Sequence, residues 1–317
     1  MRNTEIKRIS PARFWPVLLV AAVYLVNRLV PDAVPDTGGD NLAWLLLVLG
    51  LAGTVNLVAA IGWRRGSPAL IERGVVIIAL LLLLWELIVP KLGLLTPPFF
   101  PPVGRVIGVF GQDIGLLVTS TLHSLRILAL GYLLGAAIGV SLGFLVGWYR
   151  RFRWWGVPVI KVVGPIPATA LTALAIAIFP GLLGSVFLIA FAVTFPVFMN
   201  TWSGVAGIPK PLLETAQNLG ADNRFLVWRV VLPAVSPSIF TGLYIGLLVS
   251  FLTLVVAEML GVNAGLGWYI WRAQGWAEYY RVYAAVIVMG LIFSTLLTAL
   301  FTFRDHLLRW QKGMVRW

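Results

Sequence analysis

The chain has 317 residues, of which 60% are hydrophobic and only 11% are charged, and its mean hydropathy is +0.93. A soluble domain carries about 25% charged residues, so this composition excludes a soluble globular protein and indicates one immersed in lipid. The formal net charge is +12 and there is no cysteine. The basic residues lie between apolar runs, as in a membrane protein rather than a nucleic-acid-binding one, and the lack of cysteine excludes disulfides and thiolate metal sites.

Apolar runs of roughly 18 residues or more are long enough to cross a membrane as helices. Eight such runs cover residues 12–30, 42–62, 74–90, 123–147, 157–178, 183–203, 236–259 and 282–303. The sequence therefore predicts an all-α integral membrane protein with about eight transmembrane helices. The polar linker 63–73 separates the first two runs from the other six. We predict two domains: an N-terminal transmembrane hairpin, residues 1–66, and a six-helix transmembrane domain, residues 67–317.

Lysine and arginine are concentrated in alternate connections between these runs. The basic set comprises both termini, the linker 63–73, residues 150–153 and the connection 209–233. Cytoplasmic connections carry the excess of basic residues, so this set is predicted to be cytoplasmic, with both termini inside the cell. No small-residue cleavage site follows the first run, which favours an uncleaved helix over a signal peptide.

The run 123–147 carries glycines four residues apart, which form one stripe along a helix. A bare stripe lets a neighbouring helix approach closely, because lipid provides no hydrophobic drive for helices to associate. Close packing is the simpler interpretation, and a sliding surface between helices that rearrange is the alternative. The glycines are Gly131, Gly135, Gly139, Gly143 and Gly147.

The run 157–178 contains two prolines that break the helical hydrogen-bond ladder. Carbonyls freed in this way are tolerated in a membrane only against protein or a watery cavity, and interrupted helices near mid-depth are typical of transport sites. An ordinary kink satisfied by neighbouring helices is the alternative. As the lining of a translocation path we predict these prolines and six polar residues: Pro165, Pro167, Thr169, Thr172, Asn200, Ser250, Thr253 and Glu258.

Acidic residues within the apolar runs are few. Each charged side chain inside a membrane costs about 2.5–3.5 kcal/mol on insertion scales. Glu86 and Glu258 lie near the predicted outer ends of their runs, so we expect both carboxylates to reach the interface. No acid, histidine or metal cluster is predicted at mid-depth, which argues against an intramembrane enzyme. The glycine-rich stretch 261–267 follows no strand and there is no P-loop, so we expect no cofactor on this chain.

The connection 209–233 is too polar for lipid, yet its apolar residues have helical spacing. A first short helix is predicted over 211–219 and ends at Gly220, which favours a left-handed cap. Asp222 or Asn223 can cap a second short helix, which Pro233 is expected to end. The apolar face of the first helix would be formed by Leu213, Ala216 and Leu219. The alternative, a helix pair lying on the membrane surface, would need a mainly basic polar face.

This connection resembles the cytoplasmic loop of ABC importer permeases. The family pattern is Glu-Ala-Ala, three residues, Gly, nine residues, Ile, one residue and Leu-Pro. The chain keeps this spacing with Glu214, Thr215, Ala216, Gly220, Val230, Leu232 and Pro233. The resemblance implies that these residues, with Asp222, form coupling helices that bind the ATPase. "SLRILALGYLLGAAIGVSLGFLVG" and "GPIPATALTALAI" resemble the nitrate/sulfonate/taurine branch, over about residues 75–310.

The resemblance also implies a function and partners. It implies the permease subunit of an ATP-driven importer in the bacterial inner membrane, which is not itself an enzyme. The implied partners are a second permease copy, an ATPase dimer that holds ATP and Mg, and an extracytoplasmic binding protein. The implied solute is small, polar and anionic, such as a sulfonate, taurine, nitrate or bicarbonate. A vitamin or vitamin precursor (riboflavin or thiamine-pyrimidine class) is the alternative solute, and an exporter or channel the alternative function.

Overall fold

A computed structural model describes Leu25 and residues 29–30, 77, 80–82 and 84–310. The predicted hairpin 1–66 lies almost wholly outside these residues, so the domain boundary at 66 stays a prediction. The chain forms two compact units. Unit 1 comprises Met1–Ile114 and Ala273–Ala284, and unit 2 comprises Gly115–Arg272 and Ala285–Trp317.

Unit 1 holds a short π-helical segment, η2 (Leu87–Lys91), the helix α4 (Val103–Gln112) and the beginning of α13. The indole of Trp85 donates a hydrogen bond to the Pro101 carbonyl at 3.1 Å, and its ring lies edge-on to Tyr283 at 5.4 Å. Arg281 forms an ion pair of 2.8 Å with Asp113. Trp85 thus links the segment before α4 to the start of α13, and Asp113 links the C-terminal end of α4 to it.

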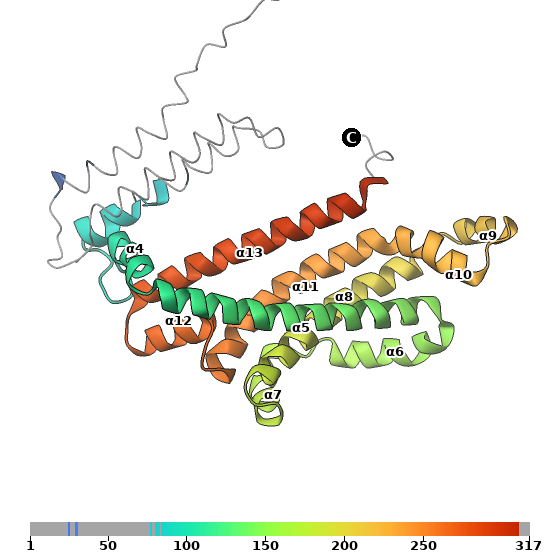
Figure 1. Cartoon of the computed structure of the whole chain (residues 1–317), viewed down its shortest axis with the longest axis horizontal. Helices are drawn as coiled ribbons and strands as arrows, with labels where there is room; N and C mark the ends of the chain where they lie inside the picture. The colour runs from blue at the N-terminus through green and yellow to red at the C-terminus, as the bar shows by residue number, and fades with distance from the viewer. Residues whose placement is uncertain (1–24, 26–28, 31–76, 78–79, 83, 311–317) are drawn as a thin grey trace, which may run out of the picture. The chain divides into compact units, whose positions relative to one another are not determined.

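Unit 2 contains the elements that position the candidate site, and in its described residues all regular structure is helical (Figure 1). Three elements cross the unit boundary: α5, α12 and α13. In chain order the elements are α5 (Ile114–Trp148), α6 (Arg150–Val163), η3 (Ala168–Leu171), α7 (Thr172–Ile178), α8 (Leu182–Ala206), α9 (Lys210–Asn218), α10 (Asn223–Phe225), η4 (Leu226–Val231), α11 (Leu232–Gly261), α12 (Leu266–Gly275) and α13 (Tyr279–Leu307).

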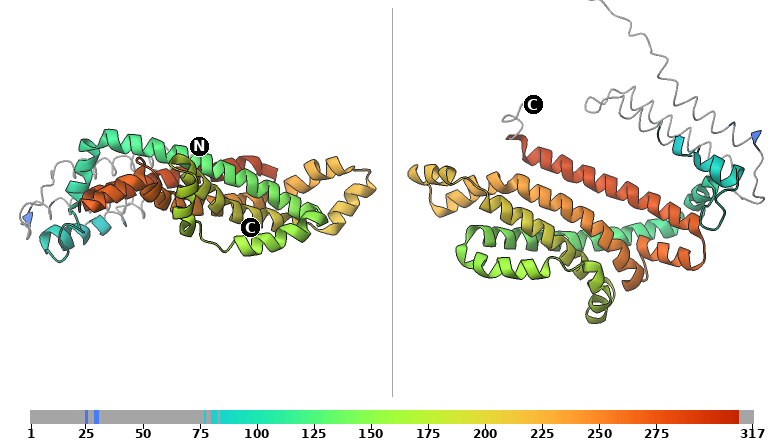
Figure 2. Two further views of the ribbon diagram at one scale, coloured as in Figure 1. Left: turned by 90° about the horizontal axis from the view of Figure 1, so that it is seen from below. Right: turned by 180° about the vertical axis from the view of Figure 1, so that it is seen from behind.

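The core of unit 2 lies where α5, α8 and α11 pack together. Its buried side chains come from all three helices: Ile127, Leu128 and Ala136, then Ile189, Val193 and Val197, then Leu254. The short helices α9 and α10 lie beyond one end of α8 and α11, and the start of α12 lies at the opposite end (Figure 1; seen from behind in Figure 2). The three long helices therefore connect two distinct ends of the unit.

Four described helices are long and apolar enough to cross a membrane: α5, α8, the continuous helix 223–261 and α13. The predicted run 157–178 is not one straight helix, because α6 and the helical segment 168–178 meet at 78°. The break falls at residues 164–167, where Pro165 and Pro167 predict it, since proline offers no N–H and clashes with the preceding turn. The described residues thus hold four spans, or five if the bent pair counts as one.

Candidate functional site

The connection 209–233, which we call the polar connection, is held in shape by hydrogen bonds at its two turns. Helix α9 ends in a Schellman motif, in which Gly220 N donates to Gln217 O at 2.9 Å and Ala221 N donates to Ala216 O at 3.0 Å. Gly220 has φ +88°, in the left-handed region that disfavours a side chain. Asp222 then caps α10, since its Oδ1 accepts from Phe225 N at 2.8 Å.

The second half of the polar connection differs from the prediction. Asn223–Gly261 is one unbroken helix of 39 residues, so the expectation that Pro233 ends a separate short helix is wrong. The wide π turns of η4 explain the difference. Leu232 N bonds to Val227 O across such a turn, and wide turns accommodate a proline that offers no N–H. Because α10, η4 and α11 form one continuous helix, a displacement of α10 is expected to displace α11 as well.

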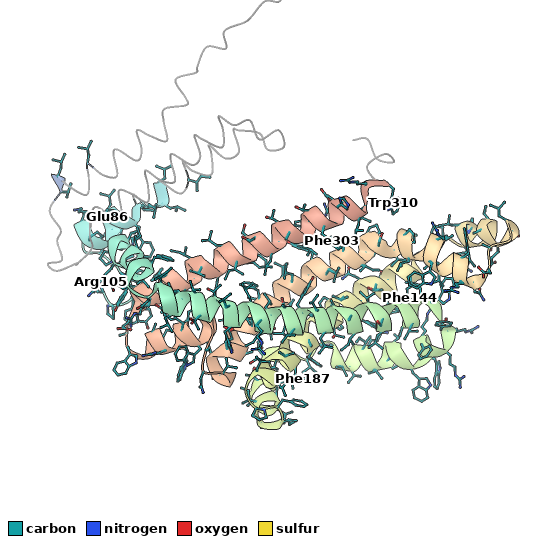
Figure 3. The ribbon with its side chains drawn as sticks, in the orientation of Figure 1. Glu86, Arg105, Phe144, Phe187, Phe303 and Trp310 are labelled. Carbon is teal, nitrogen blue, oxygen red and sulfur yellow. The ribbon has the colours of Figure 1, made fainter. Side chains whose placement is uncertain are left out.

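One face of the polar connection packs on the bundle. Leu213 contacts a buried cluster of Val205, Val231 and Val235, which Phe144 on α5 also contacts; Phe144 is labelled in Figure 3. Leu219, expected on the same face as Leu213, instead lies outside it and is 84% exposed. The reason is that Leu219 is the C-cap residue, where α9 has already ended.

The opposite face of the polar connection is open. Leu219, Phe225 and Trp228 expose large apolar surfaces, and Arg224 and Arg229 line a shallow depression with the two aromatic rings. Glu214 and Thr215 are also exposed. An exposed apolar surface with a charged rim is typical of a protein-binding site.

The five predicted glycines lie against α8. A Cβ atom built on Gly135 would approach Ala190 Cα to 2.9 Å, and one on Gly139 would approach Thr194 O to 2.8 Å and Val197 Cβ to 2.8 Å. The same holds at Gly131, Gly143 and Gly147, which meet Ile189, Thr201 and Val205. The stripe therefore brings the backbones of α5 and α8 into direct contact, as the packing interpretation expects.

A cavity of about 910 Å³ opens beside the break between α6 and α7. Four of the eight predicted path residues line it: Pro165, Pro167, Thr169 and Thr253. Its wall on α8 includes Phe187 (Figure 3), whose ring lies 5.3 Å from that of Phe179. Among the residues that the structure describes, the lining is apolar apart from three threonines, the third being Thr194.

Three other predicted path residues do not line this cavity. Thr172 Oγ1 donates to Thr169 O at 2.7 Å, Asn200 Nδ2 donates to Pro196 O at 2.8 Å, and Ser250 Oγ donates to Leu247 O at 2.7 Å. In each of these three hydrogen bonds, the side chain donates to a backbone carbonyl three or four residues earlier in the chain. Asn200 and Ser250 thereby satisfy helix carbonyls, and Thr172 bonds into the turn before α7.

Glu258 also lies outside the cavity, and the expectation that it reaches the interface is wrong. Its side chain is fully buried. Its Oε2 accepts from Ser124 Oγ on α5 at 2.9 Å and from Gly267 N on α12 at 2.8 Å, and Ser124 Oγ accepts from Leu266 N at 2.8 Å. Glu86, labelled in Figure 3, is buried in unit 1 rather than exposed.

The sequence interpretation missed the partners of Glu258. A carboxylate needs donors when it is buried, and these come from a helix 134 residues earlier in the chain and from the start of the next helix. The glycine-rich stretch 261–267 was the available signal. A Cβ on Gly265 would collide with the carboxylate, and a Cβ on Gly267 would collide with Glu258 Cβ. No group of three His, Cys, Asp or Glu within the described ranges could hold a metal ion.

Comparison with known proteins identifies the family. The profile of the family described as "Binding-protein-dependent transport system inner membrane component" matches residues 131–313, more than half of the chain. The chain is a member of this family of ABC transporter permeases. A family member is a transport subunit of the membrane, so the inferred class of multi-pass permease is confirmed. Transporters of this family work with a substrate-binding protein and an ATPase.

Three relatives show which branch the permease is similar to. MJ0413 of Methanocaldococcus jannaschii, whose name describes an ABC transporter permease, is 37% identical over 74% of this chain and 91% of its own length. The nitrate import permease protein NrtB of Leptolyngbya laminosa is 32% identical, over 69% of this chain and 73% of that protein. The taurine transport system permease protein TauC of Escherichia coli is 29% identical, over 78% of this chain and 93% of that protein. The predicted branch is confirmed.

Proposed function

We propose that this permease carries small anionic solutes, of the sulfonate, taurine or nitrate class, into the cell at the expense of ATP hydrolysed by a partner ATPase. The observation that carries the proposal is the polar connection. Its two turns are fixed by Gly220 and Asp222, its inner face is anchored through Leu213, and its outer face is exposed and apolar. A rigid, exposed element joined directly to a spanning helix is suited to pass a partner's movement into the membrane.

The distribution of basic residues supports one orientation of the permease in the membrane. The polar connection carries Lys210, Arg224 and Arg229, and the excess of basic residues marks the cytoplasmic side. With both termini inside, the ATPase would bind the polar connection from the cytoplasm, and the binding protein would deliver solute at the opposite end. ATP and Mg would be held by the ATPase, and two permease copies would enclose the path.

The cavity beside α7 supports passage rather than tight binding of the solute. None of the described residues that line it is charged, so an anion would meet no salt bridge with them. Thr194 and Thr253 line it, but their hydroxyl protons are given to the carbonyls of Ala190 and Val249. Weak contacts allow a solute to leave as readily as it enters, and the binding protein would then supply the affinity and selectivity.

The test uses proteoliposomes that contain permease and ATPase, supplied with binding protein loaded with nitrate or taurine. We expect ATP-dependent uptake of the solute. The substitutions Leu219→Ser and Trp228→Ser remove two exposed apolar side chains of the polar connection. Each should lower the affinity for the ATPase by at least about tenfold, as loss of a central interface anchor does. Leu260→Ser, at an exposed leucine at the other end of α11, is the matched control. Uptake without ATP, or equal ATPase retention by all variants, would contradict the proposal.

A further inference from the structure

Glu258 is a fully buried acid on a membrane-spanning helix. Burial of a charged or polar group without partners is expensive, so its surroundings must offer donors. One carboxylate oxygen, Oε2, receives two donors, Ser124 Oγ and Gly267 N. The other, Oε1, has no hydrogen-bond partner among the described residues. The cost of this arrangement indicates that Glu258 does something that an apolar residue could not.

The contacts of Glu258 join three elements of unit 2. Glu258 itself belongs to α11, Ser124 belongs to α5, and Gly267 N is one of the free N–H groups in the first turn of α12. Ser124 closes the arrangement by accepting from Leu266 N. The segment Val262–Gly265, which we call the outer loop, leads directly into this first turn of α12. One carboxylate on α11 and one hydroxyl on α5 thereby hold the α12 end of the outer loop.

The outer loop is packed tightly on this carboxylate. Gly265 has φ +123°, a conformation that side chains rarely adopt. A Cβ on Gly265 would approach the Glu258 carboxyl carbon to 2.5 Å, and a Cβ on Gly267 would approach Glu258 Cβ to 2.8 Å. A shift of Glu258 therefore cannot leave the outer loop in place, because there is no gap between them to absorb it.

Glu258 and the polar connection lie at opposite ends of one helix. Asn223–Gly261 is continuous and about 58 Å long at 1.5 Å per residue. Figures 1 and 2 show α9 and α10 at one end of α11 and the start of α12 at the other. A helix of this kind transmits translation and tilt along its length, since no loop interrupts it.

We propose that Glu258 is a positioning residue that makes the outer loop follow the movement of α11. This inference rests on the proposed function, in which the ATPase moves the polar connection. When α11 tilts or slides, the Glu258 carboxylate carries Gly267 and the start of α12 with it, while Ser124 limits the movement relative to α5. The end of the permease at which the binding protein delivers solute thus changes shape in step with the ATPase.

The experiment uses the absence of cysteine from the chain. Asn263→Cys, at an exposed position in the outer loop, is labelled with an impermeant maleimide in nanodiscs that contain permease and ATPase. The labelling rate is measured without nucleotide and with ATP plus vanadate. We expect a several-fold change of rate with nucleotide when Glu258 is present. Glu258→Ala should remove the nucleotide dependence, while ATPase retention and basal hydrolysis stay normal.

Three further variants separate positioning from a general loss of stability. Glu258→Gln keeps a carbonyl that can accept from Gly267 N, so it should restore most of the nucleotide dependence. Ser124→Ala removes the link to α5 and Leu266, should also lose the dependence, and carries the test if Glu258→Ala does not insert. Ser185→Ala deletes another buried hydroxyl, which α8 places beside the same end of α11. Its Oγ lies 3.4 Å from Ala257 O, and this variant should keep the dependence.

The outcomes distinguish this inference from the proposed function. An unchanged nucleotide-dependent labelling rate in Glu258→Ala, or in Ser124→Ala if Glu258→Ala does not insert, would overturn the positioning role and leave the proposed function intact. Failure of the otherwise unaltered permease to retain an ATPase would overturn the proposed function itself. Nucleotide dependence that is lost in Glu258→Ala and recovered in Glu258→Gln would support the inference.

Discussion

Gly220 holds a backbone conformation that would be costly for a residue with a side chain. Its φ of +88° lies in the left-handed region, yet a Cβ added there would meet no atom within 4 Å. The requirement for glycine is therefore conformational and not a matter of space. Glycine at this position gives α9 its end and sets the direction in which α10 begins.

Gly220→Val should therefore distort the polar connection without preventing membrane insertion. The left-handed conformation costs about 1–2 kcal/mol for a residue with a side chain, and more for a β-branched one. We expect ATPase affinity to fall about 5- to 30-fold, measured by pull-down and by ATP hydrolysis in proteoliposomes. Gly220→Asn is the control, because asparagine tolerates this conformation. Wild-type affinity in the valine variant would show that the polar connection is not the docking element.

At the scale of elements, the sequence predicts what depends on neighbours along the chain. The Gly220 cap and the break at Pro165 and Pro167 follow from local rules, and so does a cap at Asp222 or Asn223. The structure shows that Asp222 is the cap. The glycine stripe was visible as a four-residue period, but its partner α8 was not, because a helix face does not name the helix that covers it. The wide turns of η4 and the donors around Glu258 arise from packing, which no local pattern encodes.

The contact between α5 and α8 gives a second prediction. Gly139→Leu would place side-chain atoms where the Thr194 carbonyl and Val197 now lie, and overpacking costs about 1–3 kcal/mol or more when backbone must move. We expect a lower Tm in detergent and loss of the assembled transporter on size-exclusion chromatography. The control is Gly290→Leu on α13, where an added Cβ meets open space. Equal stability of both variants would mean that the stripe is not a packing surface.

At the scale of the molecule, the described spans are longer than the bilayer core. Helix α5 has 35 residues, about 52 Å, against a hydrocarbon core of about 30 Å. Part of α5 therefore extends beyond the hydrocarbon. The described residues cover, wholly or in part, the predicted spans from residue 74 onward. The first two predicted spans lie almost wholly outside them, so the count of eight stays a prediction.

The orientation can be tested on whole cells with single cysteines. Asn263→Cys and Asn218→Cys occupy exposed positions at opposite ends of unit 2. The basic residues of the polar connection predict that an impermeant maleimide labels the first in intact cells and the second only after permeabilisation. Both variants should be labelled equally in detergent, which controls for expression. Labelling of the second in intact cells would reverse the orientation.

The unbroken helix from Asn223 to Gly261 also limits how the gene can change. Asp222 and Glu258 are 36 residues apart, about ten turns, so each end faces its own partners only in one rotational phase. One inserted residue would turn everything beyond it by 100° and advance it by 1.5 Å, which would take either the exposed face of the polar connection or the outer loop out of register. The wide turns of η4 are the one segment of this helix where an extra residue could be absorbed locally. Insertions and deletions should therefore accumulate in the surrounding loops, while the length of this helix stays fixed.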